Sequence, residues 1–158
     1  MGSLGPVGRS AGLCFVNRDE IERLIPHREP FLWIDEVVEC TAESIHARKR
    51  VPVDLDVFRG HFPAQPVLPG VLLCEAALQA GAILIAHNTP LEQGQVPVVT
   101  RLNNTKFRRI VRPGDVLDIH ARLSDQLANA FFLEAHIEVD SRTAVRLEFA
   151  CATTSDAG

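Results

Sequence analysis

The feature that most constrains the fold is the apolar run of residues 70–87, GVLLCEAALQAGAILIAH. Apolar side chains fall on nearly every face of the helix that this stretch predicts, and a helix that is apolar on all sides is buried on all sides. Glu75 and Gln79 interrupt the run, which is expected to be too short to span a bilayer. The rest of the chain must therefore enclose this helix, and no membrane insertion is expected.

Segments rich in β-branched and aromatic residues lie on both sides of the predicted helix. Before it, residues 30–40 and 43–52 predict a β-hairpin, and a short helix over residues 17–26 precedes them, with Asn17 and Glu20 as a capping box. Turn compositions separate the strands predicted after the helix. These strands cover residues 96–103, 105–111, 115–124, 129–139 and 142–153. One buried helix and about half a dozen strands predict an α+β fold, with a curved antiparallel sheet wrapped around the helix.

Length and composition fit a single globular domain. The chain has 158 residues, of which 46% are hydrophobic and 23% charged. Residues 1–12 are rich in Gly and Ser and predict a flexible tail, so the domain is assigned to residues 13–154. The tail lacks the apolar core of a signal peptide, which favours a cytoplasmic protein. A formal net charge of -4 provides no electrostatic footprint for nucleic acid.

The four cysteines show no metal-ligand spacing, so no metal site is expected. In a cytoplasmic protein they are expected to stay reduced and to be small buried hydrophobic residues. They are Cys14, Cys40, Cys74 and Cys151.

Two polar residues near the helix suggest a reaction site. His61 lies in a proline-rich loop, and an imidazole can remove a proton near neutral pH. Glu75 lies inside the apolar run, where desolvation would raise its pKa and make it a neutral acid. The N–H groups near Gly70 and Val71 at the helix start could bind a carbonyl oxygen or an enolate-like charge. These parts suit proton abstraction next to a carbonyl with loss of a β-hydroxyl.

The residues alone leave simpler interpretations open. His61 can be an ordinary loop histidine and Glu75 a solvated helix residue. Gln79, one turn after Glu75, can either hold the carboxyl group by a hydrogen bond or lie at a subunit interface. His27 is expected to make a structural contact under the N-terminal loop. No role is expected for the strand histidines His46, His120 and His136.

Three motifs resemble one protein family. GHFPAQPVLPGVLLCEAALQAG (residues 60–81) resembles the signature of the β-hydroxyacyl-acyl-carrier-protein dehydratases of fatty-acid synthesis. LIPHREPFLWIDEV (24–37) and KFRRIVRPGDVL (106–117) resemble its flanking motifs, and the resemblance runs from about Ile21 to Cys151. It implies a hotdog fold, a sheet wrapped around a long helix. It also implies a homodimer with active sites at the subunit interface, which often assembles further into a trimer of dimers.

The resemblance also implies residue roles. His61 would remove the α-proton, Glu75 would protonate the departing 3-hydroxyl, and the Gly70 amide would bind the thioester carbonyl, with no cofactor. An apolar tunnel for the acyl chain would be lined by Phe62, Pro69, Leu72 and Leu73. Acyl carrier protein would deliver the substrate, and a cluster of basic residues would steer it, the alternative being a solvated strand face. That cluster is Lys106, Arg108, Arg109 and Arg112.

Some positions depart from the family pattern. Glu29 stands where the N-terminal motif commonly has an aromatic residue, and residues 99–105, VTRLNNT, are more polar than is common. Both departures leave the acyl chain length open. The carboxylate is Glu75 and not Asp, which favours the type of dehydratase that does not isomerise the double bond.

The expected reaction is therefore dehydration of (3R)-hydroxyacyl-acyl-carrier-protein to the trans-2-enoyl thioester. A second hypothesis is a thioesterase on the same fold, in which an ionised Glu75 activates water. A third is a non-catalytic hotdog protein that binds acyl chains or acyl carrier protein.

Overall fold

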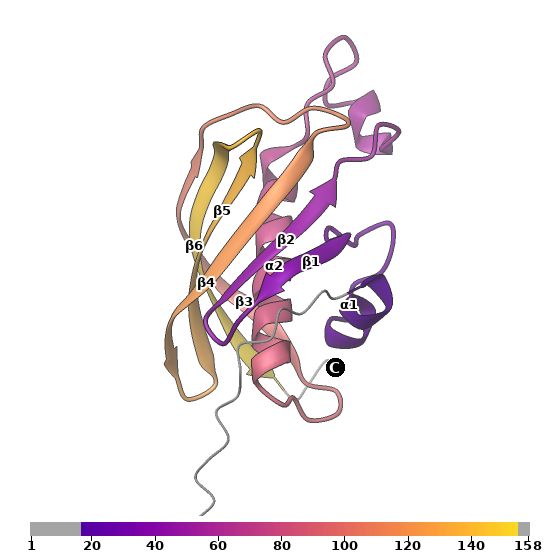
Figure 1. Cartoon of the computed structure of the whole chain (residues 1–158). Helices are drawn as coiled ribbons and strands as arrows, with labels where there is room; N and C mark the ends of the chain where they lie inside the picture. The colour runs from indigo at the N-terminus through magenta and orange to yellow at the C-terminus, as the bar shows by residue number, and fades with distance from the viewer. Residues whose placement is uncertain (1–16, 155–158) are drawn as a thin grey trace, which may run out of the picture.

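The computed structural model describes residues 17–154 as one curved sheet around a central helix (Figure 1). Its elements are α1 (Arg18–Leu24), β1 (Glu36–Cys40), β2 (Ser44–Arg50), the 3-10 helix η1 (Asp56–Arg59), α2 (Gly70–Asn88), β3 (Val96–Phe107), β4 (Val116–Leu127), β5 (Ala130–Val139) and β6 (Arg142–Thr154). The sheet has six strands in the order β1-β2-β4-β5-β6-β3, and every neighbouring pair is antiparallel. The predicted α+β architecture is confirmed.

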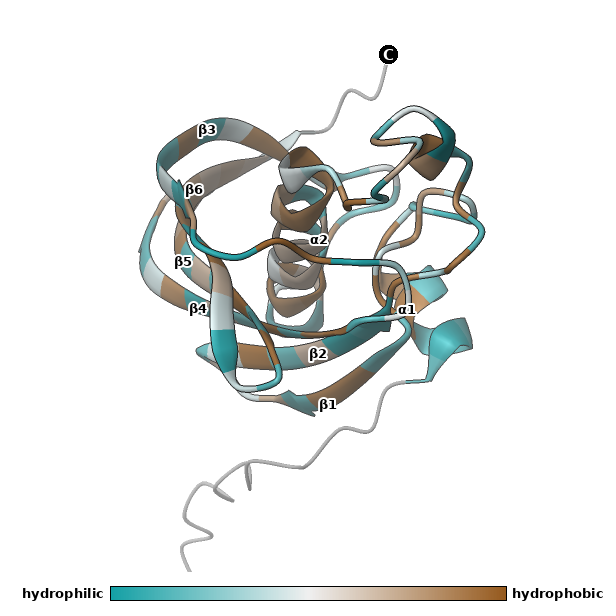
Figure 2. Cartoon of the chain, turned by 90° about the horizontal axis from the view of Figure 1, so that it is seen from above, coloured by the Kyte–Doolittle hydropathy of each residue, from teal (hydrophilic) through white to brown (hydrophobic). Residues whose placement is uncertain are grey.

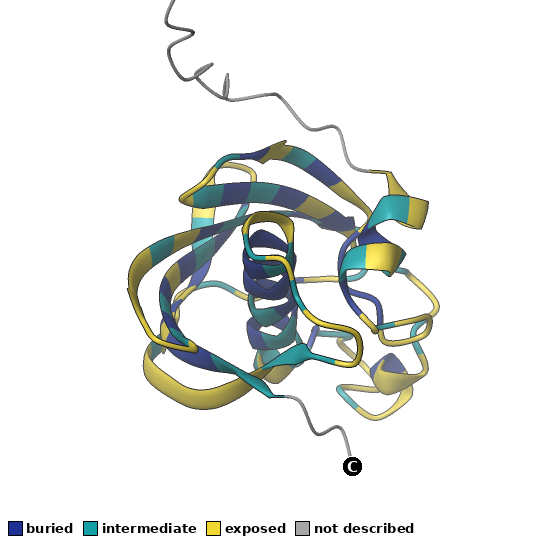
Figure 3. Ribbon diagram, turned by 90° about the horizontal axis from the view of Figure 1, so that it is seen from below, coloured by how far each residue is buried: buried dark blue, intermediate teal, exposed yellow. Residues whose placement is uncertain are grey.

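The sheet encloses α2 because its strands present an apolar face to the helix. Buried residues alternate with partly or fully exposed residues along β5, which packs against α2. Hydrophobic and hydrophilic residues alternate in the same way along the strands around the helix (Figure 2). Nearly all of the middle of α2 is buried (Figure 3). Gly81 lets the helix approach closely, since a Cβ added there would lie only 2.6 Å from Cζ of Phe149.

One expectation about α2 is wrong. The helix has the length and composition of a bilayer-crossing helix, so the argument that it is too short does not hold. Its burial beneath the sheet accounts for its apolar sequence instead.

The N-terminal elements match their predictions closely. The Glu20 N–H donates to Oδ1 of Asn17 (3.1 Å) and the Asn17 N–H donates to a Glu20 carboxylate oxygen (3.2 Å), which completes the capping box of α1. The predicted hairpin is β1–β2, although β1 begins only at Glu36 and residues 30–35 lie outside the strand.

Two strands differ from prediction. Residues 96–103 and 105–111 were expected to be separate, but β3 runs continuously from Val96 to Phe107. Its register on β6 shifts at two places, and Asn104 lies between the shifted positions with a φ of 48°. Such bulges interrupt the alternation that a sequence pattern relies on. β4 also continues to Leu127, through residues expected to form a turn.

β3 is an edge strand with an apolar surface. Among residues 17–154 it pairs only with β6, so no described strand covers its other edge. Four of its apolar side chains are exposed in the single chain: Val98, Val99, Leu102 and Phe107. An open edge that carries apolar side chains is a surface prepared for another chain.

The cysteines agree with expectation where the structure describes them. Cys40, Cys74 and Cys151 are buried, and burial raises the pKa of Cys151 to about 12. The predicted tail, residues 1–12, and Cys14 lie outside the described residues.

Candidate active site

His61 is held by its own loop in a single tautomer. Its Nδ1 lies 2.7 Å from the carbonyl oxygen of Val67, and the Val67 N–H donates back to the carbonyl of His61 (3.0 Å). A carbonyl can only accept, so Nδ1 carries the hydrogen and Nε2 keeps its lone pair. The ring stacks on Phe62 at 4.1 Å between centroids, and the peptide bond between the two residues is cis. The free Nε2 is therefore the atom able to act as a base.

Glu75 projects from the second turn of α2, and one of its oxygens is strongly engaged. Gln79 Nε2 donates to Oε1 (2.9 Å), and His27 Nε2 lies 3.5 Å from the same oxygen. Within residues 17–154, no hydrogen bond or ion pair involves Oε2. One carboxylate oxygen is thus fixed and the other is left for a ligand.

Gln79 fixes the position of Glu75 from inside the core. Its side chain is almost fully buried, and its Oε1 accepts from the Trp33 N–H (2.7 Å) while its Nε2 also donates to the Phe31 carbonyl (2.9 Å). Its donors face two acceptors and its oxygen faces a donor, so only one amide orientation satisfies every contact. The predicted Gln79–Glu75 hydrogen bond is confirmed, and the alternative position at a subunit interface is excluded because Gln79 is buried within the chain.

The predicted state of Glu75 is wrong. The contact with His27 lowers the pKa of Glu75, and together with the Gln79 hydrogen bond it outweighs the burial that would raise it. His27, expected to be a structural contact, instead lies beside the candidate acid. Its Nδ1 is buried and has no hydrogen-bond partner in the described structure. Because Glu75 and His27 lie far apart in sequence, no local pattern indicated the pair.

The start of α2 offers unpaired N–H groups. Pro69 is the N-cap and no side chain caps the helix. The Leu72 N–H donates to the Pro69 carbonyl (3.0 Å), so among the described residues the N–H groups of Gly70 and Val71 remain available to a ligand. Gly70 also has a packing role: a Cβ there would lie 2.6 Å from Cε1 of Phe107, so the missing side chain makes room for this ring. Phe107 belongs to the edge strand β3, which therefore closes over the helix start.

The structure does not bring His61 and Glu75 together within one chain. In the part of the chain that the structure describes, neither a hydrogen bond nor an ion pair joins them. The side chains predicted to line a tunnel also vary in exposure. Phe62 is exposed, Pro69 and Leu72 are half-buried, and Leu73 lies in the core. Val71 at the helix start is exposed as well.

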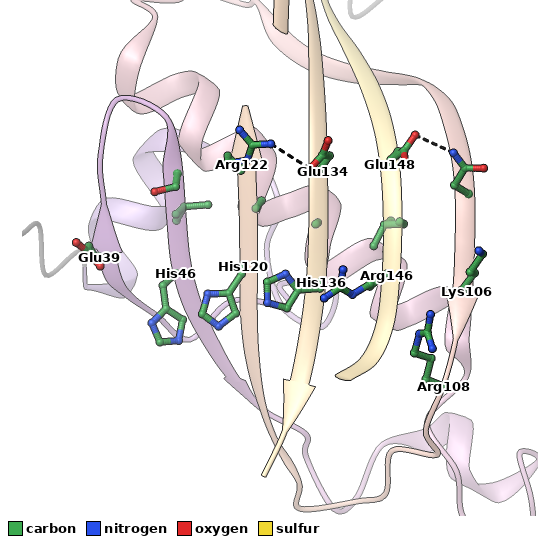
Figure 4. A pocket seen from close by; sticks show the side chains of 16 residues that line it. Glu39, His46, Lys106, Arg108, His120, Arg122, Glu134, His136, Arg146 and Glu148 are labelled. Carbon is green, nitrogen blue, oxygen red and sulfur yellow. Dashed lines mark hydrogen bonds and ion pairs between the residues drawn. The ribbon is translucent and has the colours of Figure 1, made fainter. Parts of the chain in front are cut away.

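The predicted basic cluster is not one cluster. Lys106 and Arg108 line a hollow on the outer face of the sheet (Figure 4). Arg109 instead donates to the Val139 carbonyl (3.1 Å), and Arg112 is exposed in the turn before β4. Only Lys106 lies in β3, which ends at Phe107, and the three arginines lie in the connection to β4, where residues close in sequence need not share a face.

Comparison with known proteins points to one family. The sequence model described as the FabA-like domain matches residues 25–148. Two relatives, from Rickettsia bellii (strain OSU 85-389) and Rickettsia felis, are each named 3-hydroxyacyl-[acyl-carrier-protein] dehydratase FabZ. Each is 43% identical over 131 residues, which cover 82% of this chain and 90% of the relative.

Solved structures share the fold at low sequence identity. The dehydratase heterocomplex ApeI:P from Xenorhabdus doucetiae has a TM-score of 0.71 at 19% identity, covering 85% of this chain and 90% of that chain. A hypothetical thioesterase with coenzyme A from Streptococcus pneumoniae has a TM-score of 0.60 at 12% identity, covering 77% and 87%. With the six-stranded sheet around α2, these similarities confirm the hotdog fold.

Proposed function

The chain belongs to the FabA-like family, and from this premise we propose that it is a 3-hydroxyacyl-[acyl-carrier-protein] dehydratase. One observation carries the proposal: the chain holds an imidazole that can only accept a proton at Nε2 and a carboxylate with one unengaged oxygen. A base and an acid held apart by separate structural elements suit an elimination, in which one group takes a proton while the other gives one.

The reaction follows from these groups. Nε2 of His61 removes the α-proton of the 3-hydroxyacyl thioester, and the charge that develops on the thioester oxygen is held by the N–H groups at Gly70 and Val71. The bond between C3 and its hydroxyl then breaks, and the hydroxyl takes a proton from Glu75 and leaves as water. The product is the trans-2-enoyl thioester.

The site is completed by a second copy of the chain. No hydrogen bond or ion pair joins His61 and Glu75 within residues 17–154, and the open edge of β3 carries exposed apolar side chains. Pairing of two β3 edges would form a homodimer by an isologous interface. Each site would then combine His61 of one subunit with Glu75 of the partner subunit.

The proton that Glu75 gives needs a source, because its lowered pKa leaves it ionised near neutral pH. His27 Nε2, 3.5 Å from Oε1, is placed to provide it. In this proposal the His27–Glu75 pair shares one proton, which passes through Glu75 to the leaving hydroxyl. His27 is then reprotonated from solvent, and His61 releases its own proton there. His27 is thus a positioning residue that acts through Glu75.

Acyl carrier protein is the proposed donor of the acyl group, and the cytoplasm is the proposed location. Only Lys106 and Arg108 of the predicted basic cluster line the hollow, and Arg109 donates to the Val139 carbonyl instead, so carrier docking is not assigned to the cluster as one unit.

A subunit-mixing experiment tests this proposal. His61→Ala and Glu75→Gln are each expected to lower the dehydration rate by about 10²–10⁴-fold. Dimers that combine one subunit of each variant contain one site in which both residues are intact. Co-expression at equal levels should therefore restore about a quarter of wild-type activity, because half of the dimers are mixed and each has one working site.

The outcomes separate the alternatives. No recovery on mixing would show that His61 and Glu75 act within one subunit. Release of free thiol from the thioester would indicate a thioesterase, and acyl binding without turnover by the wild type would indicate a binding protein.

A further inference from the structure

A single row of residues crosses all six strands on the face of the sheet that points away from α2 (Figure 4). Each member lies directly opposite the next in the strand register. From β1 to β3 the row is Glu39, His46, His120, His136, Arg146 and Lys106. We call this set the cross-strand row. It begins with a carboxylate on β1, continues with three imidazoles and ends with two cations at the β3 edge.

The three imidazoles of the row form a stack. The ring centroids of His46 and His120 are 4.3 Å apart with an interplanar angle of 16°, and those of His120 and His136 are 4.8 Å apart at 12°. Nearly parallel rings do not direct their nitrogens to a common point. Among residues 17–154, no group of three or more His, Cys, Asp or Glu side chains is arranged to hold a metal ion. The row is therefore not built for a cation.

The carboxylates around the row already have partners. Glu134 pairs with Arg122 (3.2 Å), and Glu148 accepts from Asn104 (2.9 Å). On the other side, Asp118 accepts from Arg48 (2.9 Å) and lies 2.8 Å from His46 Nε2, while Glu138 lies 3.8 Å from His136 Nε2.

The cations at the β3 end lack such partners. Within the described residues, the side chains of Lys106, Arg108 and Arg146 take part in no hydrogen bond or ion pair. Arg146 and Lys106 are directly opposite in register, and like charges in that position destabilise a sheet. An anion placed between them would offset this repulsion.

The surface at this place is hollowed. The cations and His136 line a hollow of about 820 Å³, which also includes the side chains of Ser44 and Asn104. We propose that Arg146, Lys106, Arg108 and His136 form a binding site for a phosphate group, either as inorganic phosphate or as a small phosphomonoester. Arginine presents a planar set of donors that matches phosphate oxygens, and lysine adds a compact charge.

Binding at this site should depend on pH through His136. Burial, and then the charge of Arg146, lower the pKa of His136, against the opposing effect of Glu138. The other charged or titratable groups around it are His120 and Asp118 on β4, Glu134 on β5, and Lys106 and Arg108 at the β3 end. A bound dianion would favour the imidazolium form, so affinity should increase as the pH falls through the pKa of His136.

Calorimetric titration of the full chain with inorganic phosphate and, separately, with methyl phosphate tests the proposal. Saturable binding is expected, and the affinity expressed per dianion should be tighter at pH 6 than at pH 8, since the ligand itself gains a proton over this range. Binding should be about tenfold weaker in Arg146→Gln, as for loss of one charge-assisted hydrogen bond. Arg142→Gln, which removes the same charge from an exposed position of β6 outside the hollow, should bind like the wild type. A preference for one ligand identifies whether the free ion or the ester is the natural class.

The proposal is overturned if the wild type shows no saturable binding of either ligand, or if Arg146→Gln and Arg142→Gln bind equally. Circular dichroism verifies that both variants are folded. Because binding is measured without turnover, this result is independent of the dehydratase assignment, and Arg146→Gln should retain wild-type dehydration.

Discussion

At the scale of single residues, hydrogen bonds to the backbone fix the tautomer of His61 and the amide orientation of Gln79. The Val67 carbonyl fixes the hydrogen of His61 on Nδ1, and the Trp33 N–H fixes the orientation of the Gln79 amide. Gln79 then presents a donor to Glu75. Backbone groups thus orient His61 through one hydrogen bond and Glu75 through two hydrogen bonds in series, by way of Gln79. This orientation reduces the reorganisation needed during reaction.

His27→Gln tests the role of the imidazole beside Glu75. Its loss should raise the pKa of Glu75, because the largest cause of the lowered value is removed while burial remains. In the proposed mechanism the proton comes from the His27–Glu75 pair as a unit, whereas the variant must take it from Glu75 alone. The alkaline limb of the pH–kcat/KM profile should therefore move to lower pH, with activity at pH 7.5 reduced by about 10- to 100-fold.

His87→Gln provides the matched control, since His87 is exposed at the end of α2. An unchanged profile in His27→Gln would mean that His27 only packs against the helix.

At the residue scale, the sequence predicted most of the candidate site but not the direction of the Glu75 pKa shift. His61, Glu75 and the Gln79 hydrogen bond follow from a polar residue placed in or next to an apolar helix. The sign of the Glu75 pKa shift does not follow, because it depends on His27, which only the folded chain brings near. Burial can be inferred from a local pattern, whereas a partner distant in sequence cannot.

At the scale of elements, α2 sets the dimensions of the fold through its small residues. Gly81 faces Phe149 of β6 and Leu133 of β5, and the contact allows the helix to lie close to the sheet. Both partners are buried and therefore have little room to move.

Gly81→Val should lower the free energy of unfolding by about 2–3 kcal/mol, because overpacking a dense core costs roughly 1–3 kcal/mol and valine gains little helix propensity over glycine. Urea denaturation measures the change as a lower midpoint with an unchanged slope. Gly60→Val is the control: a Cβ at Gly60 meets nothing within 4 Å, so stability should change by less than about 0.5 kcal/mol. Equal effects at the two positions would contradict this explanation of the Gly81 contact.

The order of the main elements was predictable, but the number of strands and their local irregularities were not. The apolar helix, the hairpin and the later strands follow from periodicity and turn composition. The continuity of β3 was missed because Asn104 adopts a positive φ within the second of its two register shifts. The basic residues were grouped wrongly because only Lys106 belongs to β3, while the arginines lie in the connection to β4.

At the scale of the whole molecule, the open edge of β3 predicts how the chain assembles. Leu102→Glu would place a charge on this exposed apolar strand, and we expect it to convert a dimer into monomers and to abolish dehydration with it. Light scattering coupled to size-exclusion chromatography measures the mass, and the same samples give the activity.

Leu127→Glu is the matched control, because Leu127 is also an exposed leucine and lies at the end of β4, next to the turn into β5. A monomeric Leu102→Glu variant with full activity would show that one chain contains a complete site.

The functional groups on α2 lie in a short part of the helix, and this limits which substitutions can persist as the sequence evolves. The N–H groups at Gly70 and Val71, Glu75, Gln79 and Gly81 all lie on it within three turns, so the same helix supports the reaction and the core. Few substitutions on α2 can be neutral for both the reaction and the packing of the core. Adaptation to a new acyl group must then come from surrounding segments, such as the loop after η1 and the β3 edge. Natural variation among descendants of this sequence should concentrate there and leave the helix almost untouched.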